Sequence, residues 1–193
     1  EHGFRARARD GAGNASDYSP VVSTTLDRTA PVTSSMSLTV TGETGHVYGS
    51  TAYYGLGEGT FTVTLTVSDP LPALGQAAGL DAIVFPDTVS AGGVYDRDGA
   101  LTATVVHTYT FNLSDTVSGS YAVTATDRAT NTTAIPFNVV RDVTGPASAI
   151  TATLGTPPTI AVSWSADDAT GAGVQDYDVE YAVDEGAWTG GFT

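Results

Sequence analysis

The sequence contains no cysteine and no lysine, and all seven of its basic residues are arginines. The absence of cysteine excludes a disulfide framework and thiolate metal sites, and it suits a secreted bacterial surface protein at least as well as a cytosolic one. The absence of lysine excludes the lysine-dependent isopeptide bonds that cross-link some surface domains. Stability must therefore come from buried apolar surface, backbone pairing or bound ions.

Positive charge and long apolar runs are scarce as well. The formal net charge is -14 and the isoelectric point is near 4.1, so phosphate backbones and anionic membrane surfaces would repel the chain. No apolar run approaches the ~18 residues that span a bilayer. We therefore expect no nucleic-acid partner and no membrane insertion in this segment.

Threonine is abundant, with 31 of the 193 residues, and it alternates with apolar residues in the clearest patterns. A period of two with threonine on the polar face predicts half-buried antiparallel strands. The strongest case sets Phe61, Val63, Leu65 and Val67 against Thr60, Thr62, Thr64 and Thr66. Further apolar runs cover residues 36–40, 83–85, 101–111, 121–125, 135–140, 160–164 and 177–183. Turn residues separate these runs, which predicts an all-β fold of antiparallel β-sandwiches.

Two motifs recur at nearly the same distance. Phe4-x-Ala6-x-Ala8-x-Asp10-x-Ala12-x-Asn14 matches Tyr121-x-Val123-x-Ala125-x-Asp127-x-Ala129-x-Asn131, 117 residues later (127 minus 10). Asp27-x-Thr29-x-Pro31 matches Asp142-x-Thr144-x-Pro146, 115 residues later (142 minus 27). The first motif predicts a strand that ends in a tight turn, and the proline of the second ends a sheet. One period is about the length of a sandwich domain.

These repeats predict the organisation of the chain. Residues 32–143 form one complete sandwich, bounded by linkers at residues 27–31 and 144–146. Residues 1–26 are expected to be the last strands of a preceding domain, and residues 147–193 the first strands of a following one. Neither flanking part has enough chain to bury a core alone.

The motif of residues 4–14 resembles the end of a bacterial fibronectin type III-like repeat, and residues 162–168, 173–181 and 188–189 resemble the start of one. The resemblance implies core positions for Trp164, Tyr177 and Tyr181. The middle module resembles the Ig-like repeats of large bacterial surface proteins, with Tyr121 at the position of a tyrosine corner. Such modules occur in adhesins, appendages and secreted hydrolases, so the resemblance implies a fold more closely than a function.

Two arrangements explain the flanking parts. The chain is a window of a long tandem array, which is the commoner arrangement, or the N-terminal strands of one subunit complete the C-terminal part of the next. In both, the partners are neighbouring copies or domains of the same protein, joined end to end.

Catalysis is not expected, because the three histidines are scattered and no nucleophile motif or phosphate loop occurs. Calcium is the leading candidate ligand, since acidic turns at domain junctions supply the oxygen atoms that a hard cation prefers. Asp10, Asp27, Asp127 and Asp142 are the candidate ligands, and the alternative is that they cap turns.

Arg5, Arg7 and Arg9 alternate on one strand face of this acidic chain. They form either a solvated face or a basic strip that docks an acidic neighbour. Tyr53, Tyr54, Tyr95 and Trp188 either stack on surface glycans or pack in cores and interfaces. We expect a structural module of an extracellular filament, stalk or cell-surface fibre. An adhesive or carbohydrate-binding module is the alternative.

Overall fold

The computed structural model describes residues 2–24, 26–42, 44–72, 76–156, 159–184 and 186–192. The described residues form fifteen strands and no helix, so the all-β prediction is confirmed and no described helix could cross a membrane. In chain order the strands are β1 (His2–Phe4), β2 (Val22–Thr24), β3 (Val32–Thr41), β4 (Gly45–Tyr48), β5 (Thr51–Tyr54), β6 (Gly59–Ser68), β7 (Leu80–Phe85), β8 (Gly93–Ala100), β9 (Thr102–Phe111), β10 (Gly119–Asp127), β11 (Thr132–Arg141), β12 (Ala147–Leu154), β13 (Ile160–Asp167), β14 (Val179–Tyr181) and β15 (Thr189–Phe192).

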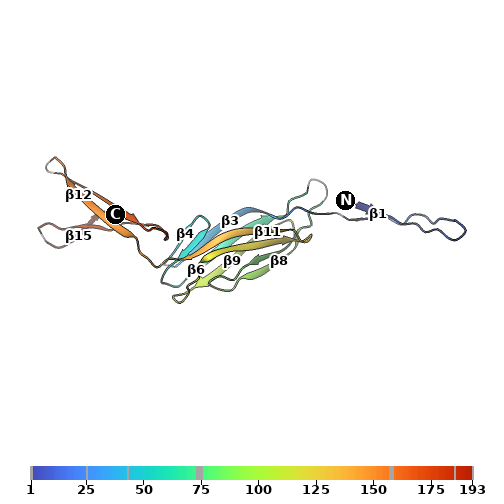
Figure 1. Cartoon of the computed structure of the whole chain (residues 1–193), viewed down its shortest axis with the longest axis horizontal. Helices are drawn as coiled ribbons and strands as arrows, with labels where there is room; N and C mark the ends of the chain where they lie inside the picture. The colour runs from blue at the N-terminus through green and yellow to red at the C-terminus, as the bar shows by residue number, and fades with distance from the viewer. Residues whose placement is uncertain are drawn as a thin grey trace.

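Strands β3 to β11 form a central body of two facing sheets. One sheet has the order β3-β6-β9, and the other has the order β4-β5-β11-β10-β7-β8. All pairs are antiparallel except β5 with β11, which is parallel. The molecule is elongated, with the N-terminal hairpin and the C-terminal hairpins at opposite ends of this body (Figure 1).

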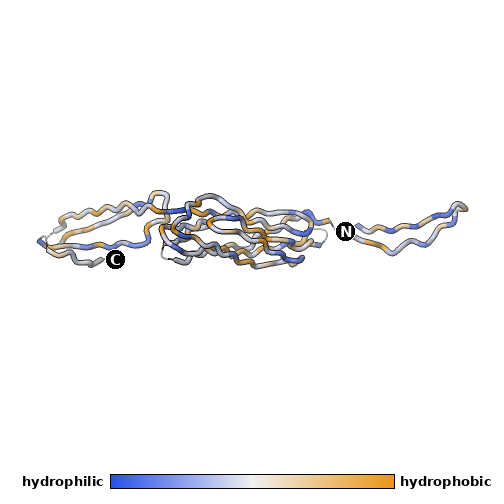
Figure 2. Tube along the Cα trace, turned by 90° about the horizontal axis from the view of Figure 1, so that it is seen from below, coloured by the Kyte–Doolittle hydropathy of each residue, from blue (hydrophilic) through white to orange (hydrophobic). Residues whose placement is uncertain are grey.

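The hydrophobic core lies between the two sheets of the central body. Phe61, Val63, Leu65 and Val67 of β6 are at most 1% exposed, and they pack with Val123 and Phe137 of the other sheet. Burial alternates along β6, and Figure 2 shows apolar segments gathered within the central body. All members of the core cluster lie between residues 38 and 139, within the range predicted for the complete module.

The threonines of β6 lie on the outer face of the three-stranded sheet. Thr62 and Thr66 bond across to β9 through hydroxyl pairs with Thr108 and Thr104, at 2.9 and 3.0 Å. Cross-strand threonine pairs of this kind each contribute a few tenths of a kcal/mol, up to ~1 kcal/mol. The alternating pattern therefore gives one buried apolar face, as predicted, and one polar face whose threonine hydroxyls are hydrogen-bonded across the strands.

The ends of the molecule consist of hairpins without a core of their own. In the N-terminal hairpin, Phe4 of β1 lies opposite Val22 of β2, and these side chains are 63% and 70% exposed. At the C-terminal end β12 pairs with β13, and β14 pairs with β15. The residue Val179 is the one buried hydrophobic side chain among the described residues beyond 146.

The resemblance assigned core positions to Trp164, Tyr177 and Tyr181, and the structure differs. Trp164 and Tyr181 are 38% and 50% exposed, and Tyr177 is half-buried. Two hairpins offer too little surface to enclose these rings. The hydroxyl of Tyr177 accepts a bond from the Ala166 N–H at 3.1 Å, which ties the second hairpin to the first.

Candidate metal centre

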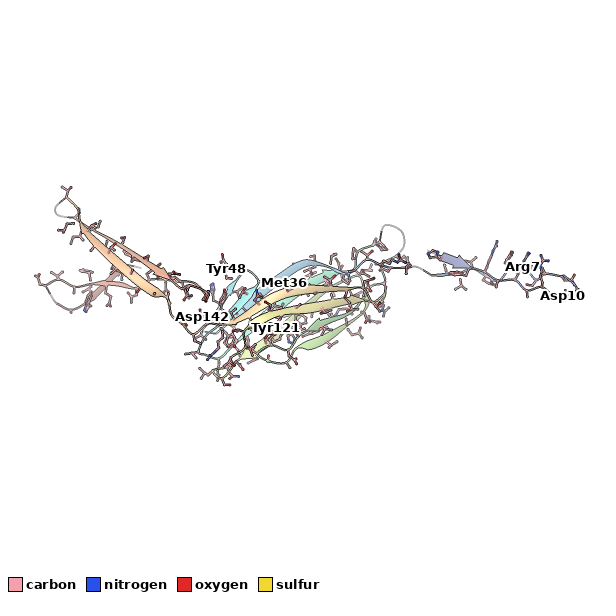
Figure 3. The ribbon with its side chains drawn as sticks, in the orientation of Figure 1. Arg7, Asp10, Met36, Tyr48, Tyr121 and Asp142 are labelled. Atoms are coloured by element: carbon pink, nitrogen blue, oxygen red, sulfur yellow. The ribbon has the colours of Figure 1, made fainter. Side chains whose placement is uncertain are left out.

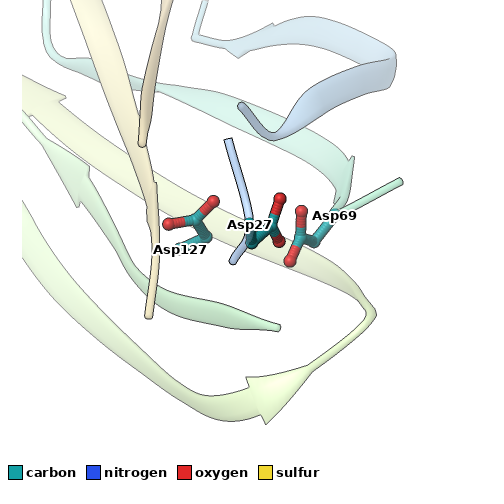
Figure 4. Close-up of side chains that lie close together, drawn as sticks. All are labelled: Asp27, Asp69 and Asp127. Carbon is teal, nitrogen blue, oxygen red and sulfur yellow. The ribbon is translucent and has the colours of Figure 1, made fainter. Parts of the chain in front are cut away.

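Three aspartates from distant parts of the sequence meet at one end of the central body (Figure 4). Asp27 lies in the segment between β2 and β3, Asp69 directly follows β6, and Asp127 is the last residue of β10. One carboxylate oxygen of each lies within 4.8 Å of the other two, and the residues are 6%, 4% and 0% exposed. The fold thus buries three acids together.

The carboxylate of Asp27 is held on both sides by backbone N–H groups. Thr29 donates to Oδ1 at 2.9 Å, which closes the turn that leads to Pro31. Ala78 donates to Oδ2 at 2.7 Å from the long connection that precedes β7. Asp27 therefore anchors the segment before β3 to a loop of the module itself.

Asp69 is bound on one side only. The N–H of Gly79 donates to Oδ2 at 2.7 Å, whereas Oδ1 is buried and has no hydrogen-bond partner. Gly79 has φ of +83°, and a Cβ atom there would collide with the Gly99 backbone, so glycine is required for this approach. Burial, followed by repulsion from Asp27 and Asp127, raises the pKa of Asp69 above its ordinary value.

Asp127 is clamped by the turn that connects β10 to β11. Its Oδ1 accepts a bond from the Asn131 backbone N–H and its Oδ2 from the Asn131 side-chain amide, both at 2.8 Å. Thr130 takes a left-handed conformation, with φ of +69°, and donates to the Asp127 carbonyl at 3.1 Å. This is the tight turn predicted for the Asp-x-Ala-x-Asn motif.

No described arginine or histidine neutralises the three acids, because the one ion pair among the described residues joins Arg128 to Asp98 on the surface. Burying unpaired carboxylates together costs free energy unless a positive charge compensates them. A calcium ion fits the donor set, since it prefers carboxylate oxygens and tolerates irregular geometry. The unpartnered Oδ1 of Asp69 is the atom whose environment a cation would complete.

The cluster contains two of the four predicted ligands and adds one that the prediction missed. Asp27 and Asp127 come together, 100 residues apart in sequence (127 minus 27). Asp69 was missed because an acid after a strand is ordinary in a turn. Its available signal was its position next to Pro70, at the end of the most regular strand in the chain.

Asp10 lies at the tip of the N-terminal hairpin, and Asp142 lies where the central body joins the C-terminal hairpins (Figure 3). Asp10 is exposed and accepts bonds from both nitrogen atoms of Asn14 at 2.9 Å, which lower its pKa. Asp142 accepts bonds from the N–H groups of Thr144 and Ala172 at 3.2 and 2.7 Å. Both therefore cap turns within this chain.

The predicted interface arginines Arg5, Arg7 and Arg9 are exposed on the N-terminal hairpin. The guanidinium groups of Arg5 and Arg7 lie over the ring of Tyr18, 4.1 and 5.0 Å from its centroid. These contacts hold the arginine side chains together on one face of the hairpin.

The aromatic residues considered for glycan stacking divide into buried and exposed ones. Tyr54 is 1% exposed and packs in the core, and its hydroxyl donates to the Val117 carbonyl at 2.7 Å. Tyr95 is half-buried and bonds to His107 at 2.9 Å. Tyr53 lines a cavity of about 240 Å³, and Trp188 is 70% exposed.

Comparisons with protein-family models, with curated proteins and with solved structures gave no match to this chain.

Proposed function

We propose that this chain is a structural module of an extracellular filament, stalk or cell-surface fibre, built from Ig-like and fibronectin III-like β-sandwiches in tandem and stiffened by calcium at their junctions. The observation that carries the proposal is the position of Asp27. It belongs to the segment that enters the central body, yet it is buried with two acids of that body. An ion bound there would join the incoming chain to the module.

The order of the strands supports the Ig-like part of the proposal. The sheet β3-β6-β9 faces a sheet in which β11, β10, β7 and β8 are neighbours. With β3 as the first strand, this corresponds to the A-B-E and G-F-C sheets of an Ig-like sandwich, with three added strands: β8 beside β7, and β5 and β4 beyond β11. The edge strand β8 lies beside β7, where the variable-type sandwich adds its extra strand.

The composition supports an extracellular structural role. The chain has no cysteine to be oxidised and carries an acidic net charge of -14, which keeps long assemblies soluble. Calcium is abundant outside cells, where sites with millimolar dissociation constants are sufficient. A junction that stiffens on binding calcium therefore suits a fibre exposed to the medium.

The proposal is tested by pulling the full chain between its ends in a single-molecule force experiment. We expect a higher unfolding force for the central body in calcium than in a chelator. Asp27→Asn should remove this difference, because it weakens the one ligand supplied by the incoming segment. Asp17→Asn, in the exposed N-terminal hairpin, is the matched control and should keep it. Equal forces with and without calcium in the unaltered chain would refute the proposal.

A further inference from the structure

The turn around Asp10 has the hydrogen bonds of the turn around Asp127. In both, the asparagine four residues later donates its backbone N–H to Oδ1 and its side-chain amide to Oδ2. In both, the aspartate backbone N–H also bonds to that asparagine's carbonyl, at 3.0 and 3.1 Å. The N-terminal hairpin therefore contains a turn that holds Asp10 in the way that the β10–β11 turn holds Asp127, one of the three aspartates of the metal centre.

Near the C-terminal hairpins, two further aspartates repeat the hydrogen bonds of the other two members of the metal centre, Asp27 and Asp69. Asp142 accepts from Thr144 and Ala172 as Asp27 accepts from Thr29 and Ala78. Asp168 accepts from the N–H of Gly173 at 2.7 Å, as Asp69 accepts from Gly79. Gly173 has φ of +89° and Gly79 has +83°. Asp142 and Asp168 are therefore held by backbone N–H groups in the same way as Asp27 and Asp69. The acid that corresponds to Asp127, which would complete the set of three, is Asp10.

One chain cannot bring these parts together, because Asp10 lies at the tip of the N-terminal hairpin and Asp142 at the far end of the central body, where the C-terminal hairpins begin (Figure 3). Two copies arranged head to tail can. The central body supplies the register for such a contact, since β10 carries Asp127 and pairs with β7 in antiparallel fashion.

The register of β10 with β7 can be transferred to the two ends. Residues 4–14 match residues 121–131, and residues 172–179 match residues 78–85, both without a gap. Thr124 lies opposite Val84, and Thr126 lies opposite Ala82. In the two ends these pairs become Arg7 with Asp178 and Arg9 with Asp176. The next outward pair in the same register is Arg5 with Glu180.

In this transferred register, every arginine of the N-terminal hairpin would lie opposite an acid of the C-terminal part. All six side chains are exposed in the single chain. Residues 147–193 contain seven acids and no arginine or lysine, so nothing in that part of the sequence competes for them. Opposite charges directly across two strands stabilise the pairing, and the same pairs one position out of register would not form.

The other face of the same pairing is apolar. Ala8 lies opposite Tyr177, Ala6 opposite Val179, and Phe4 opposite Tyr181 in this register. In the central body the residues at the positions of Ala6 and Val179 are Val123 and Phe85, which are 0% and 2% exposed. Phe4, 63% exposed in the single chain, gains an apolar partner in the contact.

We propose that the N-terminal hairpin of one copy docks against residues 174–181 of a second copy. The contact pairs Arg5, Arg7 and Arg9 with Glu180, Asp178 and Asp176, and it brings Asp10 to Asp142 and Asp168 as a second calcium centre. The partner is a second copy of this chain, and repetition of the contact gives a head-to-tail fibre. This inference rests on the proposed function, because it uses the same three-aspartate frame.

The test measures self-association of the full chain by sedimentation velocity in calcium. We expect concentration-dependent oligomers, roughly tenfold weaker association for Arg7→Asp alone or Asp178→Arg alone, and recovery in the chain that carries both changes. The combination of Arg7→Asp with Asp176→Arg is one pair out of register and should not recover. A chain that stays monomeric, or equal recovery by both combinations, would overturn the proposal.

Calcium supplies the second readout. Asp10→Asn should remove the calcium dependence of association, whereas Asp17→Asn on the same hairpin should leave it intact. Failure here is separable from failure of the proposed function. If the chain is monomeric but its unfolding force still depends on calcium, only the proposed docking contact is refuted. If the unfolding force does not depend on calcium, the proposed calcium centre at Asp27 is refuted.

Discussion

The substitution Asp69→Asn should have opposite effects on stability in the presence and absence of calcium. Without calcium, the carboxylate of Asp69 has one buried oxygen with no partner and lies beside two further acids. An asparagine keeps an oxygen for the Gly79 N–H and turns its amide toward the other carboxylates. Relief of one orphaned buried group is worth about 1–3 kcal/mol, so the variant should be the more stable protein in a chelator.

With calcium, the unaltered chain should instead be more stable than the Asp69→Asn variant. An ion at about one hundred times its dissociation constant stabilises the folded chain by about 2.7 kcal/mol. For a module of roughly 110 residues this raises the melting temperature by about 10 °C. Asparagine supplies one neutral oxygen in place of a charged carboxylate, so most of this gain should be absent from the variant.

The assay is thermal unfolding followed by circular dichroism, in calcium and in a chelator, for both proteins. Asp81→Asn is the matched control, because Asp81 is exposed on β7, outside the cluster. It should change stability by no more than about 0.5 kcal/mol in either condition. A variant that is destabilised in the chelator too, or that gains as much from calcium as the unaltered chain, would refute the reasoning.

Three further outcomes follow from the same geometry. Because the folded state raises the pKa of Asp69, the calcium-free chain should gain stability at this site as the pH falls from neutrality toward the ordinary value of 3.8, measured by urea unfolding across that range. Asn131→Ala removes the side-chain amide bond to Asp127 Oδ2 and keeps the backbone N–H bond to Oδ1, so it should cost about 1.5–3 kcal/mol, measured by urea unfolding in calcium. Tyr54→Phe removes the bond to the Val117 carbonyl and should cost about 1 kcal/mol without changing the calcium response, measured by thermal unfolding.

The sequence predicted strands where the pattern is local. Along β6, threonine alternates with apolar residues over the whole strand, and burial follows the alternation without exception from Phe61 to Ser68. Strands β4 and β5 escaped prediction because they are four residues long and include glycine and adjacent tyrosines. They pair with each other as a hairpin, and β5 joins the sheet through β11, more than eighty residues away. Such contacts leave little trace in a short segment.

The metal centre shows the same division between local and long-range information. Asp127 was predicted from a motif that recurs at Asp10, and Asp27 from one that recurs at Asp142. Asp69 joins them only because β6 ends beside the turn of β10, and no local pattern records that contact. Repetition therefore identified the two clustered acids that lie in repeated motifs and missed the one that does not.

The burial of Asp27 bears on how such a chain can be lengthened by gene duplication. A duplicated unit that starts at Asp27 and ends after β11 carries all three acids with it. A unit that starts at β3, with Val32, leaves the first acid behind and adds a module with an incomplete centre. In a tandem chain of the proposed kind, the segment before each module would be inherited with that module, and the acid cluster rather than the first strand would set the length of the repeat.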